Sequence, residues 1–430
     1  MESVLSAGDT SWVLTSAALV LLMIPGLAFF YGGMVRSKSV LNMLMMVMSA
    51  LFVVGVLWII FGYSIAFGTS NGGLFGNPTE YFGLEGLMTD DPESVLPVMA
   101  FVAFQAMFAC LTVGLIAGAI PDRMKFGAWI IFGAIWAVIV YFPVAHWVWA
   151  PGGWIFELGV IDFAGGTAVH INAGAAALAL ALIVGRRVGW PKTPMRPHNL
   201  TLVMLGAGLL WFGWFGFNAG SALAANNTSA VVFVNTFAAT CAAAIGWLVV
   251  EKIRDGHMTS LGAASGVVAG LVAITPACSA VSPIGALILG VIAGVLCALA
   301  VGLKYRLGYD DSLDVVGVHL VGGLVGTLLI GFLATELAPA GVNGLFYGGG
   351  TEQLGKQAIG AFAVLFYSLI VAAIIAMVIK AAGGIRVSKD VEVGGIDLAE
   401  HAESAYELGE AGGGGVFAGV GHAARNKVEE

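Results

Sequence analysis

Charged residues are scarce in this chain. Only 10% of its 430 residues are Asp, Glu, Lys or Arg, whereas 59% are hydrophobic. A soluble domain carries about 25% charged residues, because its surface must face water. The low charge content therefore excludes a soluble enzyme. The mean hydropathy of +0.94 indicates a multi-pass membrane protein instead.

Cysteine is also rare, and its spacing excludes further classes of protein. The four cysteines lie far apart inside apolar stretches, and no two form a CxxC pair. This pattern is typical of small core side chains, not of a metal site or a disulfide framework. Basic residues form no patch of the kind that binds nucleic acid, so neither a nucleic-acid partner nor a cofactor is expected. Glycine, by contrast, is abundant at 62 residues, which favours closely packed membrane helices.

Apolar segments of about 20 residues recur along the chain, each long enough to cross ~30 Å of hydrocarbon as a helix. We predict an all-α fold with eleven transmembrane helices. Their approximate bounds are 11–34, 40–67, 97–120, 126–149, 163–185, 200–220, 229–250, 259–276, 284–303, 313–334 and 356–381.

The loops between these segments differ sharply in positive charge. Twelve basic residues follow the odd-numbered helices, and none lies in the even-numbered loops before Lys356. Because positively charged loops stay in the cytoplasm, the odd-numbered loops are predicted to be cytoplasmic. In the cell membrane, the N-terminus would then lie outside the cell and the C-terminus in the cytoplasm. The chain is thus divided into a transmembrane domain, 1–382, and a cytoplasmic tail, 383–430. The twelve basic residues are Arg36, Lys38, Arg123, Lys125, Arg186, Arg187, Lys192, Arg196, Lys252, Arg254, Lys304 and Arg306.

Two of the seven histidines, His170 and His319, lie well inside predicted helices. Each follows an aspartate by eight residues, and the first of these, Asp162, is placed to cap the start of the fifth helix. The other aspartate is Asp311. The fifth and tenth helices enter from opposite sides, which predicts two inverted five-helix halves, helices 1–5 and 6–10. Eight residues correspond to about 12 Å, so both histidines are expected near the midplane, where their rings can touch.

Two matched histidines at this depth point to a function. Ionisable residues inside a membrane are costly and usually mark a pathway or a relay. A purely structural role for each histidine is the simpler alternative. Haem ligation by the pair is another, and it would make the chain a membrane oxidoreductase, although no second histidine pair is present.

Aromatic residues gather near the predicted outer ends of several helices. Trp149 and Ser221 end the fourth and sixth helices, Phe217 lies one turn below Ser221, and Phe104 and Phe108 share one face of the third helix. Tryptophan at an interface and phenylalanine in a core are ordinary. Together, however, aromatic faces attract a cation and a serine hydroxyl accepts an N–H bond, so the mixture favours a cation site at the outer mouth.

The sequence resembles the ammonium transporter family, the Amt/Mep/Rh proteins, most closely the bacterial and archaeal Amt branch. The match runs in order through all eleven predicted helices and into the tail at GGIDLAEHAESAY (394–406). The other segments that carry it are FFYGGMVRSKSVLN (29–42), FQAMFACLTVGLIAGAIPDRMKF (104–126), AHWVWAPGG (145–153), DFAGGTAVHINAG (162–174), WFGWFGFNAGSALAAN (211–226), GLVAITPACSAVSPIGA (270–286) and SLDVVGVHLVGG (312–323).

The resemblance implies a homotrimer in which each subunit has its own narrow apolar pore. It also implies a role for each of the residues singled out above. The outer ammonium site would be Trp149, Ser221 and Phe108, with Asp162 behind it; the gate Phe108 and Phe217; and the pore His170, His319 and Trp214. One departure is the loop that contains Pro151, between Trp149 and Asp162, which is expected to alter only the vestibule.

Such a pore would transport ammonium and methylammonium but not K⁺. K⁺ has no N–H to donate and no proton to lose, and an apolar pore makes a bare ion costly. Ammonium would lose its proton near the gate and cross as NH3, with co-transport of the proton left open. A sensor with little flux is the alternative, although the 48 residues of the tail (383–430) are too few for a soluble signalling domain.

The sequence also predicts structure and a role for the tail. IDLAEHAESAYEL (396–408) predicts a short helix that Asp397 caps, with its acids facing basic residues of the cytoplasmic loops. GEAGGGGVFAGVG (409–421) predicts a flexible end. The resemblance implies that the tail couples the subunits and lies beside the docking face for a PII-type nitrogen-signalling protein.

Overall fold

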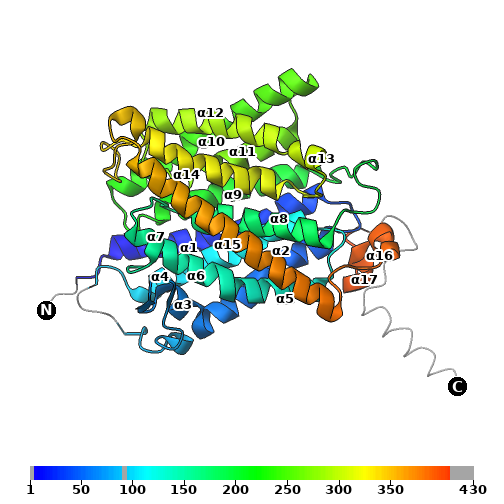
Figure 1. Ribbon diagram of the computed structural model, residues 1–430, viewed down its shortest axis with the longest axis horizontal. Coiled ribbons are helices and arrows are strands. Elements are labelled where there is room, and N and C mark those ends of the chain that lie inside the picture. Colours follow the sequence, from blue (N-terminus) through cyan, green and yellow to red (C-terminus); the bar gives the residue numbers. More distant parts are fainter. Residues whose placement is uncertain (1–3, 90–93, 407–430) are drawn as a thin grey trace.

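The computed structural model describes residues 4–89 and 94–406, and it is a bundle of helices packed side by side (Figure 1). Within these residues, ten helices are long and apolar enough to cross a membrane. The elements of the first half are α1 (Ala7–Met34), α2 (Val40–Leu57), η1 (Trp58–Gly62), α3 (Tyr63–Phe67), β1 (Ser70–Asn71), β2 (Phe75–Gly76), η2 (Phe82–Leu84), α4 (Val98–Ile116), η3 (Ala117–Ala119), α5 (Phe126–Trp136), η4 (Ala137–Tyr141), α6 (Phe142–Trp149), α7 (Trp154–Glu157), η5 (Gly166–Ile171) and α8 (Asn172–Val184).

The second half is also helical and ends in the tail. Its elements are α9 (Leu200–Gly220), α10 (Asn227–Asp255), α11 (Ser260–Ile274), α12 (Pro283–Ala300), α13 (Leu303–Leu307), η6 (Val316–Leu320), α14 (Val321–Leu333), η7 (Leu345–Tyr347), α15 (Glu352–Gly383), α16 (Lys389–Gly394) and α17 (Ile396–His401). The eighth predicted span corresponds to α11, which at 15 residues is shorter than a full crossing. The all-α membrane architecture is as predicted.

Glycines let the first helices of the two halves approach closely. A Cβ added to Gly206 of α9 would lie 2.3 Å from the backbone nitrogen of Phe30 on α1, and one on Gly216 would lie 2.6 Å from the Cβ of Leu19. Small residues at such crossings bring backbones into contact, as in other membrane helices. The last long helix, α15, runs obliquely across the bundle, against α8 and α14 (Figure 1).

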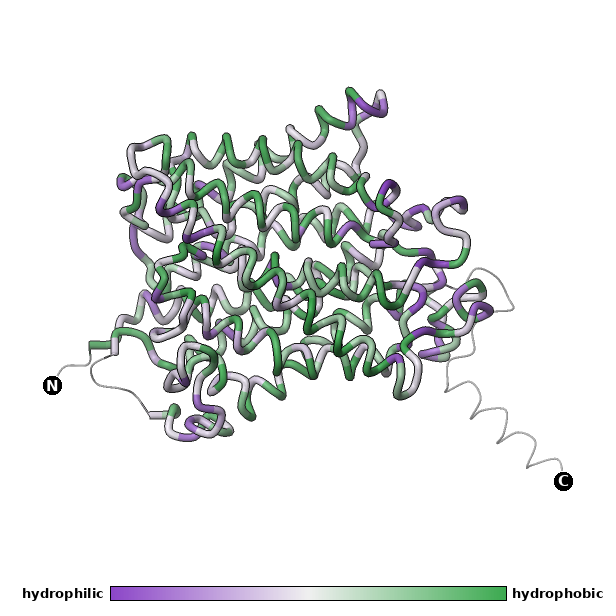
Figure 2. The backbone as a smooth tube through the Cα atoms, in the orientation of Figure 1, coloured by the Kyte–Doolittle hydropathy of each residue, from purple (hydrophilic) through white to green (hydrophobic). Residues whose placement is uncertain are grey.

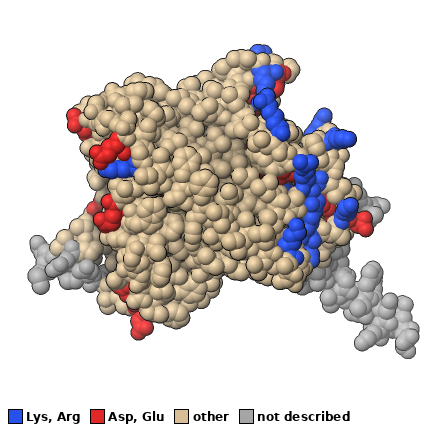
Figure 3. Space-filling model, in the orientation of Figure 1, with Lys and Arg blue, Asp and Glu red and all other residues tan. Residues whose placement is uncertain are grey.

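Polar residues collect at the two ends of the bundle, and apolar residues fill the band between them (Figure 2). Lys and Arg gather at one end and most visible Asp and Glu at the other (Figure 3). A short hairpin lies at the acidic end, where Ser70 pairs with Gly76 and Asn71 with Phe75. This separation of charge is the pattern of a protein that lies across a membrane.

Candidate functional site

The two buried histidines meet inside the bundle. His170 Nδ1 lies 3.2 Å from His319 Nδ1, and the ring centroids are 5.3 Å apart. Both side chains are buried, with 0% and 3% of their surface exposed. Each histidine sits in a π-helical turn, η5 or η6, a local widening that often marks functional sites. The contact agrees with the depth predicted from the sequence, whereas nothing in the sequence signalled the π-turns.

An aspartate holds the start of each of these two helices. The Asp162 carboxylate accepts hydrogen bonds from four successive backbone N–H groups, those of residues 165–168, at 2.5–2.9 Å. Asp311 accepts from Val315 and Val316 at 3.1 and 2.8 Å. Burial raises the pKa of Asp162, and its four N–H donors act in the opposite direction. The predicted capping by Asp162 is confirmed, and the second half repeats it.

The two helices run in opposite directions. Arg123 donates to the carbonyl of Gly185, just after α8, at 2.7 Å, and to that of Asp310, shortly before η6, at 2.6 Å. The end of one histidine helix therefore lies beside the start of the other. This arrangement brings His170 and His319 to the same level from opposite ends.

Two phenyl rings stack above the histidines. Phe108 of α4 and Phe217 of α9 have centroids 4.1 Å apart and nearly parallel planes, at 25°. Phe104 packs edge-on against Phe108 at 4.9 Å. The centroid of Phe217 lies 6.1 Å from that of His170. The phenyl pair thus lies directly beside the histidine pair.

Trp149 and Ser221 lie on the far side of the phenyl pair from the histidines. The Trp149 ring stands at 88° to Phe108, with centroids 5.9 Å apart, and its Nε1 donates to the Asp162 carbonyl at 2.9 Å. Ser221 Oγ donates to the carbonyl of Phe217 at 2.8 Å. Because that bond uses the only hydroxyl proton of Ser221, its oxygen is left to act as an acceptor toward a further N–H group.

Trp214 of α9 stacks beside the histidines. Its ring lies 5.4 Å from His170 at an angle of 21°, and its Nε1 donates to Thr275 Oγ1 at 2.8 Å. Thr275 in turn donates to the carbonyl of Leu271 at 2.7 Å. Thr275 therefore orients the indole, a role that the sequence analysis missed. The only signal for it in the sequence is Pro276, which follows Thr275 at the end of the eighth predicted span.

The contact distance also bears on haem ligation. An iron between two imidazole nitrogens lies about 2 Å from each, so the nitrogens of a ligating pair stand about 4 Å apart across the metal. The two Nδ1 atoms are 3.2 Å apart and the rings lie at 25°. This geometry fits a shared proton and not a metal.

Comparison with known proteins decides the family. The family model described as Ammonium Transporter Family matches residues 11–406. The chain belongs to the ammonium transporter family. It is 61% identical to an ammonium transporter of Mycobacterium tuberculosis, over 94% of this chain and 91% of that protein. It is 48% identical to an ammonium transporter of Aquifex aeolicus, over 95% of both chains.

Solved structures of the family have the same fold. The crystal structure of Saccharomyces cerevisiae Mep2 superposes with a TM-score of 0.86 at 34% identity, covering 96% of this chain and 94% of that one. A structure described as Sensor Amt Protein superposes with a TM-score of 0.85 at 31% identity, covering 92% and 98%. This transporter is accordingly a multi-pass membrane protein and not an enzyme.

The basic end of the transporter contains a buried ionic lock. Arg187 binds the Asp310 carboxylate through two nitrogens, at 2.8 and 2.9 Å, and also lies 3.6 Å from Asp122. Arg36 lies 3.2 Å from the other carboxylate oxygen of Asp122. Burial raises the pKa of Asp310, but the positive charges of Arg187 and Arg123 lower it by more. The net pKa therefore lies below its ordinary value. The lock ties the ends of the histidine helices to the loop after α1.

The described part of the tail, up to residue 406, packs on this same end and corrects one prediction. Asp397 does not cap its own helix; its carboxylate accepts from the backbone N–H groups of Leu41 and Asn42 at 3.0 and 2.8 Å, at the start of α2. Glu400 accepts from the N–H of Phe126, at the start of α5, at 3.0 Å. Neither α2 nor α5 has a side-chain cap at its own N-cap residue. The tail acids therefore bind backbone at helix starts, where the prediction paired them with basic side chains.

The predicted tail helix is also shorter than expected. It spans Ile396–His401, and the predicted flexible end (409–421) lies outside the described residues. Within the tail segment itself, Glu392 pairs with Arg386 at 2.7 Å. The loop residues Arg36 and Lys38 do contact the tail, but they donate to the backbone carbonyls of Glu392 and Val393 and not to tail carboxylates.

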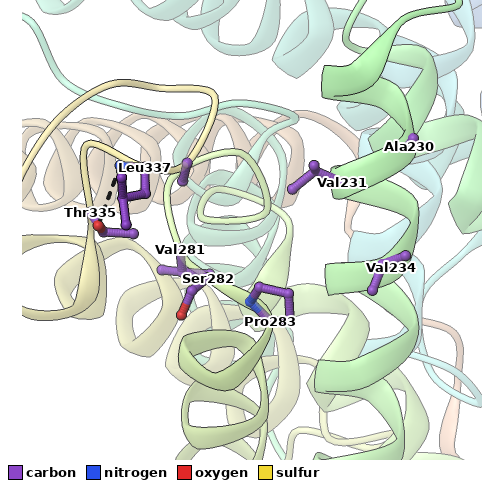
Figure 4. Close-up of a pocket in the computed structure, with 9 residues that line it drawn as sticks. Ala230, Val231, Val234, Val281, Ser282, Pro283, Thr335 and Leu337 are labelled. Atoms are coloured by element: carbon purple, nitrogen blue, oxygen red, sulfur yellow. Dashed lines mark hydrogen bonds between the residues drawn. The ribbon is translucent and has the colours of Figure 1, made fainter.

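An apolar pocket of about 420 Å³ lies apart from the pore residues (Figure 4). It opens between α10 and the segments before α12 and after α14. Its lining residues are Ala230, Val231, Val234, Val281, Ser282, Pro283, Thr335, Leu337 and Ala338. None of the predicted site residues lines this pocket, so it is separate from the site described above.

Proposed function

We propose that this chain conducts ammonium across the membrane, binding NH4⁺ at an outer site and passing NH3 along the histidine pair. The observation that carries the proposal is the unbroken row of rings from Trp149 through Phe108 and Phe217 to His170 and His319, with neighbouring centroids 4.1–6.1 Å apart. A cation meets aromatic faces and the Ser221 oxygen first, then a closed apolar gate, then polar nitrogens.

Passage through the gate, formed by Phe108 and Phe217, is the step that discriminates ammonium from K⁺. The phenyl rings offer no oxygen to replace the water around an ion, so a charge that enters between them loses its hydration without compensation. Ammonium escapes this cost by leaving its proton outside and crossing as neutral NH3. K⁺ has no such route.

The histidine contact suits a neutral guest. Two Nδ1 atoms 3.2 Å apart share one proton, so one ring donates and the other accepts. When both rings are neutral, the accepting ring carries its own proton on Nε2 and the donating ring has a bare Nε2. The pair then offers one donor and one acceptor to NH3, which itself both donates and accepts. His170 Nε2 is buried and has no hydrogen-bond partner within the described residues, which fits a contact that the substrate completes.

The deciding experiment is uptake by purified protein in liposomes. We expect uptake of methylammonium, competition by ammonium, and no flux of K⁺ above that of protein-free liposomes. Currents measured at the same time report whether the proton follows. Rescue of a K⁺-transport-deficient strain by the wild-type protein would contradict the proposed selectivity.

A sensor with little flux is the second candidate, because the chain also resembles the structure described as Sensor Amt Protein over 98% of that chain. Both candidates share the outer site and the gate. Ammonium binding without measurable uptake in the same liposomes would favour the sensor.

The proposal includes a homotrimer, an outside N-terminus, a tail (383–430) that regulates transport, and a PII-type protein that docks at the basic face. The gathering of Lys and Arg at one end supports the orientation (Figure 3). The contacts of Asp397 and Glu400 with helix starts support a regulatory tail, because they connect it to the transmembrane bundle.

A further inference from the structure

A third buried histidine lies near the outer site. His146 is on α6, one helical turn before Trp149, and none of its surface is exposed. Its Nδ1 lies 3.0 Å from the carbonyl oxygen of Ala66 on α3, and its Nε2 lies 2.8 Å from Ser70 Oγ on β1. Since a carbonyl only accepts hydrogen bonds, Nδ1 carries a proton.

Ser70 has more partners than its single proton can serve. Its Oγ accepts from the Gly73 N–H at 3.2 Å and donates to the Gly152 carbonyl at 3.0 Å. If Ser70 donates to Gly152, then Nε2 of His146 must donate to Ser70, and the imidazole is doubly protonated. If His146 is neutral, the Ser70 proton is drawn to Nε2 and the bond to Gly152 is lost. Because Gly152 is exposed, water replaces Ser70 there at little cost.

The bond to Gly152 holds the loop that follows Trp149. The same hairpin holds both sides of this loop, through Trp154 N–H to the Gly73 carbonyl at 3.2 Å and Trp147 Nε1 to the Leu74 carbonyl at 2.6 Å. Of these three bonds, the Ser70–Gly152 bond is the one that changes with the protonation state of His146.

We propose that His146 is a positioning residue for the outer site, and that with Ser70 it forms a proton-dependent latch on the loop 150–153. The proposal rests on the proposed function, in which Trp149 binds the cation. With His146 protonated, the latch is closed and Trp149 is held edge-on to Phe108. With His146 neutral, Gly152 is released and the carboxyl side of Trp149 loses one of its restraints.

Several titratable groups lie on the elements that pack against α6. Glu157 on α7 accepts from the Gly152 N–H at 3.1 Å, so its carboxylate lies at the same loop. Glu80 binds the hydroxyl of Thr69, next to Ser70, at 3.0 Å. Among the described residues, the other titratable groups on these elements are Tyr63 on α3, Tyr141 on η4 and His170 on η5. Tyr367 of α15 also packs against α6, with its ring centroid 4.7 Å from that of Trp147.

The latch predicts a change in affinity and not in maximal rate. Across the pH range in which His146 loses its proton, the KM for methylammonium should rise. The expected rise is about two- to tenfold, the factor that a single hydrogen bond supports, with the maximal rate unchanged.

The experiment compares wild type with Ser70→Ala, which removes the latch in every protonation state. His146→Gln, which cannot become charged, is the second variant. Thr79→Ala is the matched control, since the Thr79 hydroxyl donates to Asn77 of the same outer loop. Two readouts are taken across the pH range: KM and maximal rate of uptake, and hydrogen–deuterium exchange of segment 150–154, corrected for the intrinsic pH dependence of exchange.

We expect KM and exchange to rise with pH in wild type and in Thr79→Ala, and to be flat at the high-pH level in Ser70→Ala and His146→Gln. Exchange in Ser70→Ala that keeps the wild-type pH dependence would overturn the latch, as would a wild-type protein whose exchange does not change with pH. Exchange is measured without transport, so an absence of uptake would count against the proposed function and leave the test of the latch intact.

Discussion

At the scale of single residues, the proposed pore depends on a few polar groups that lie in apolar surroundings. His170 and His319 are each other's partners at 3.2 Å, and Trp214 is held beside them by Thr275. Removing one member of such a contact leaves a buried polar group unpaired, which costs about 1–3 kcal/mol. The two histidines are therefore expected to behave as one unit.

Replacing either histidine tests this directly. We predict that His170→Ala or His319→Ala lowers uptake about tenfold or more, or loosens discrimination against K⁺, because the polar path is broken. The double variant should be about as impaired as the worse single variant, since the residues act together. His257→Ala, at an exposed position between α10 and α11, is the control. Wild-type flux and selectivity in both single variants would contradict the assigned role.

At the scale of elements, helix ends are held by groups distant in sequence. The lock of Arg187 and Asp310 joins the end of α8 to the start of η6, and Arg123 contributes five hydrogen bonds to the same region while fully buried. Burial lowers the pKa of Arg123 to about 10, so the guanidinium stays charged at neutral pH. Breaking a buried pair of this kind by removing one partner costs about 3–5 kcal/mol.

The lock predicts a loss of stability in acid. The pKa of Asp310 lies below its ordinary value, so its ionised form stabilises the folded protein above about pH 4, and this contribution is lost as the pH falls through the lowered pKa. Thermal unfolding in detergent between about pH 7 and 3 should show the loss. Asp310→Asn should unfold at a lower temperature than wild type at pH 7, and its unfolding temperature should fall less as the pH is lowered. Asp255→Asn, in a surface pair with Arg254, should match wild type at pH 7. An acid profile unchanged in Asp310→Asn would refute the assignment.

The tail caps two helices that have no caps of their own. We predict that Asp397→Ala destabilises the start of α2 by about 1 kcal/mol, the usual effect of removing a cap. Because the same carboxylate anchors the tail, limited proteolysis should cut residues 395–406 faster in this variant. Asp390→Ala, at an exposed position in α16, is the matched control. Equal cleavage rates in the two variants would show that Asp397 does not anchor the tail.

At the scale of the whole molecule, the tail and the bundle share the basic end. Removing residues 395–430 deletes both caps, so we predict that the bundle still folds and forms a trimer but is less stable by about 2 kcal/mol. Uptake should fall, and binding of a PII-type protein should weaken. Size-exclusion chromatography with light scattering, uptake in liposomes and a binding assay measure the three effects. Unchanged uptake together with undiminished binding would show that the tail has neither role.

The apolar length of the segments and the placement of charge were readable from the sequence alone. Burial in a bilayer demands about 20 apolar residues per crossing, and this demand is met locally, so spans such as 200–220 were predicted to the residue. The matched depth of His170 and His319 was likewise a matter of counting residues along helices. Composition alone left the roles of the site residues open, and the resemblance to ammonium transporters then suggested a role for each of them.

Tertiary structure decided what depends on contacts between distant segments. Asp397 looks like the cap of its own helix, yet it binds α2 some 355 residues earlier, because folding brings an uncapped helix start within reach of its carboxylate. The π-turns at both histidines, the hydrogen bond from Trp214 to Thr275 and the competition of His146 and Gly152 for the one Ser70 proton have no local signature either. Hydrophobic length is a property of a segment, whereas a hydrogen bond is a property of two groups in space, so the sequence by itself determined the spans and only the fold decided their partners.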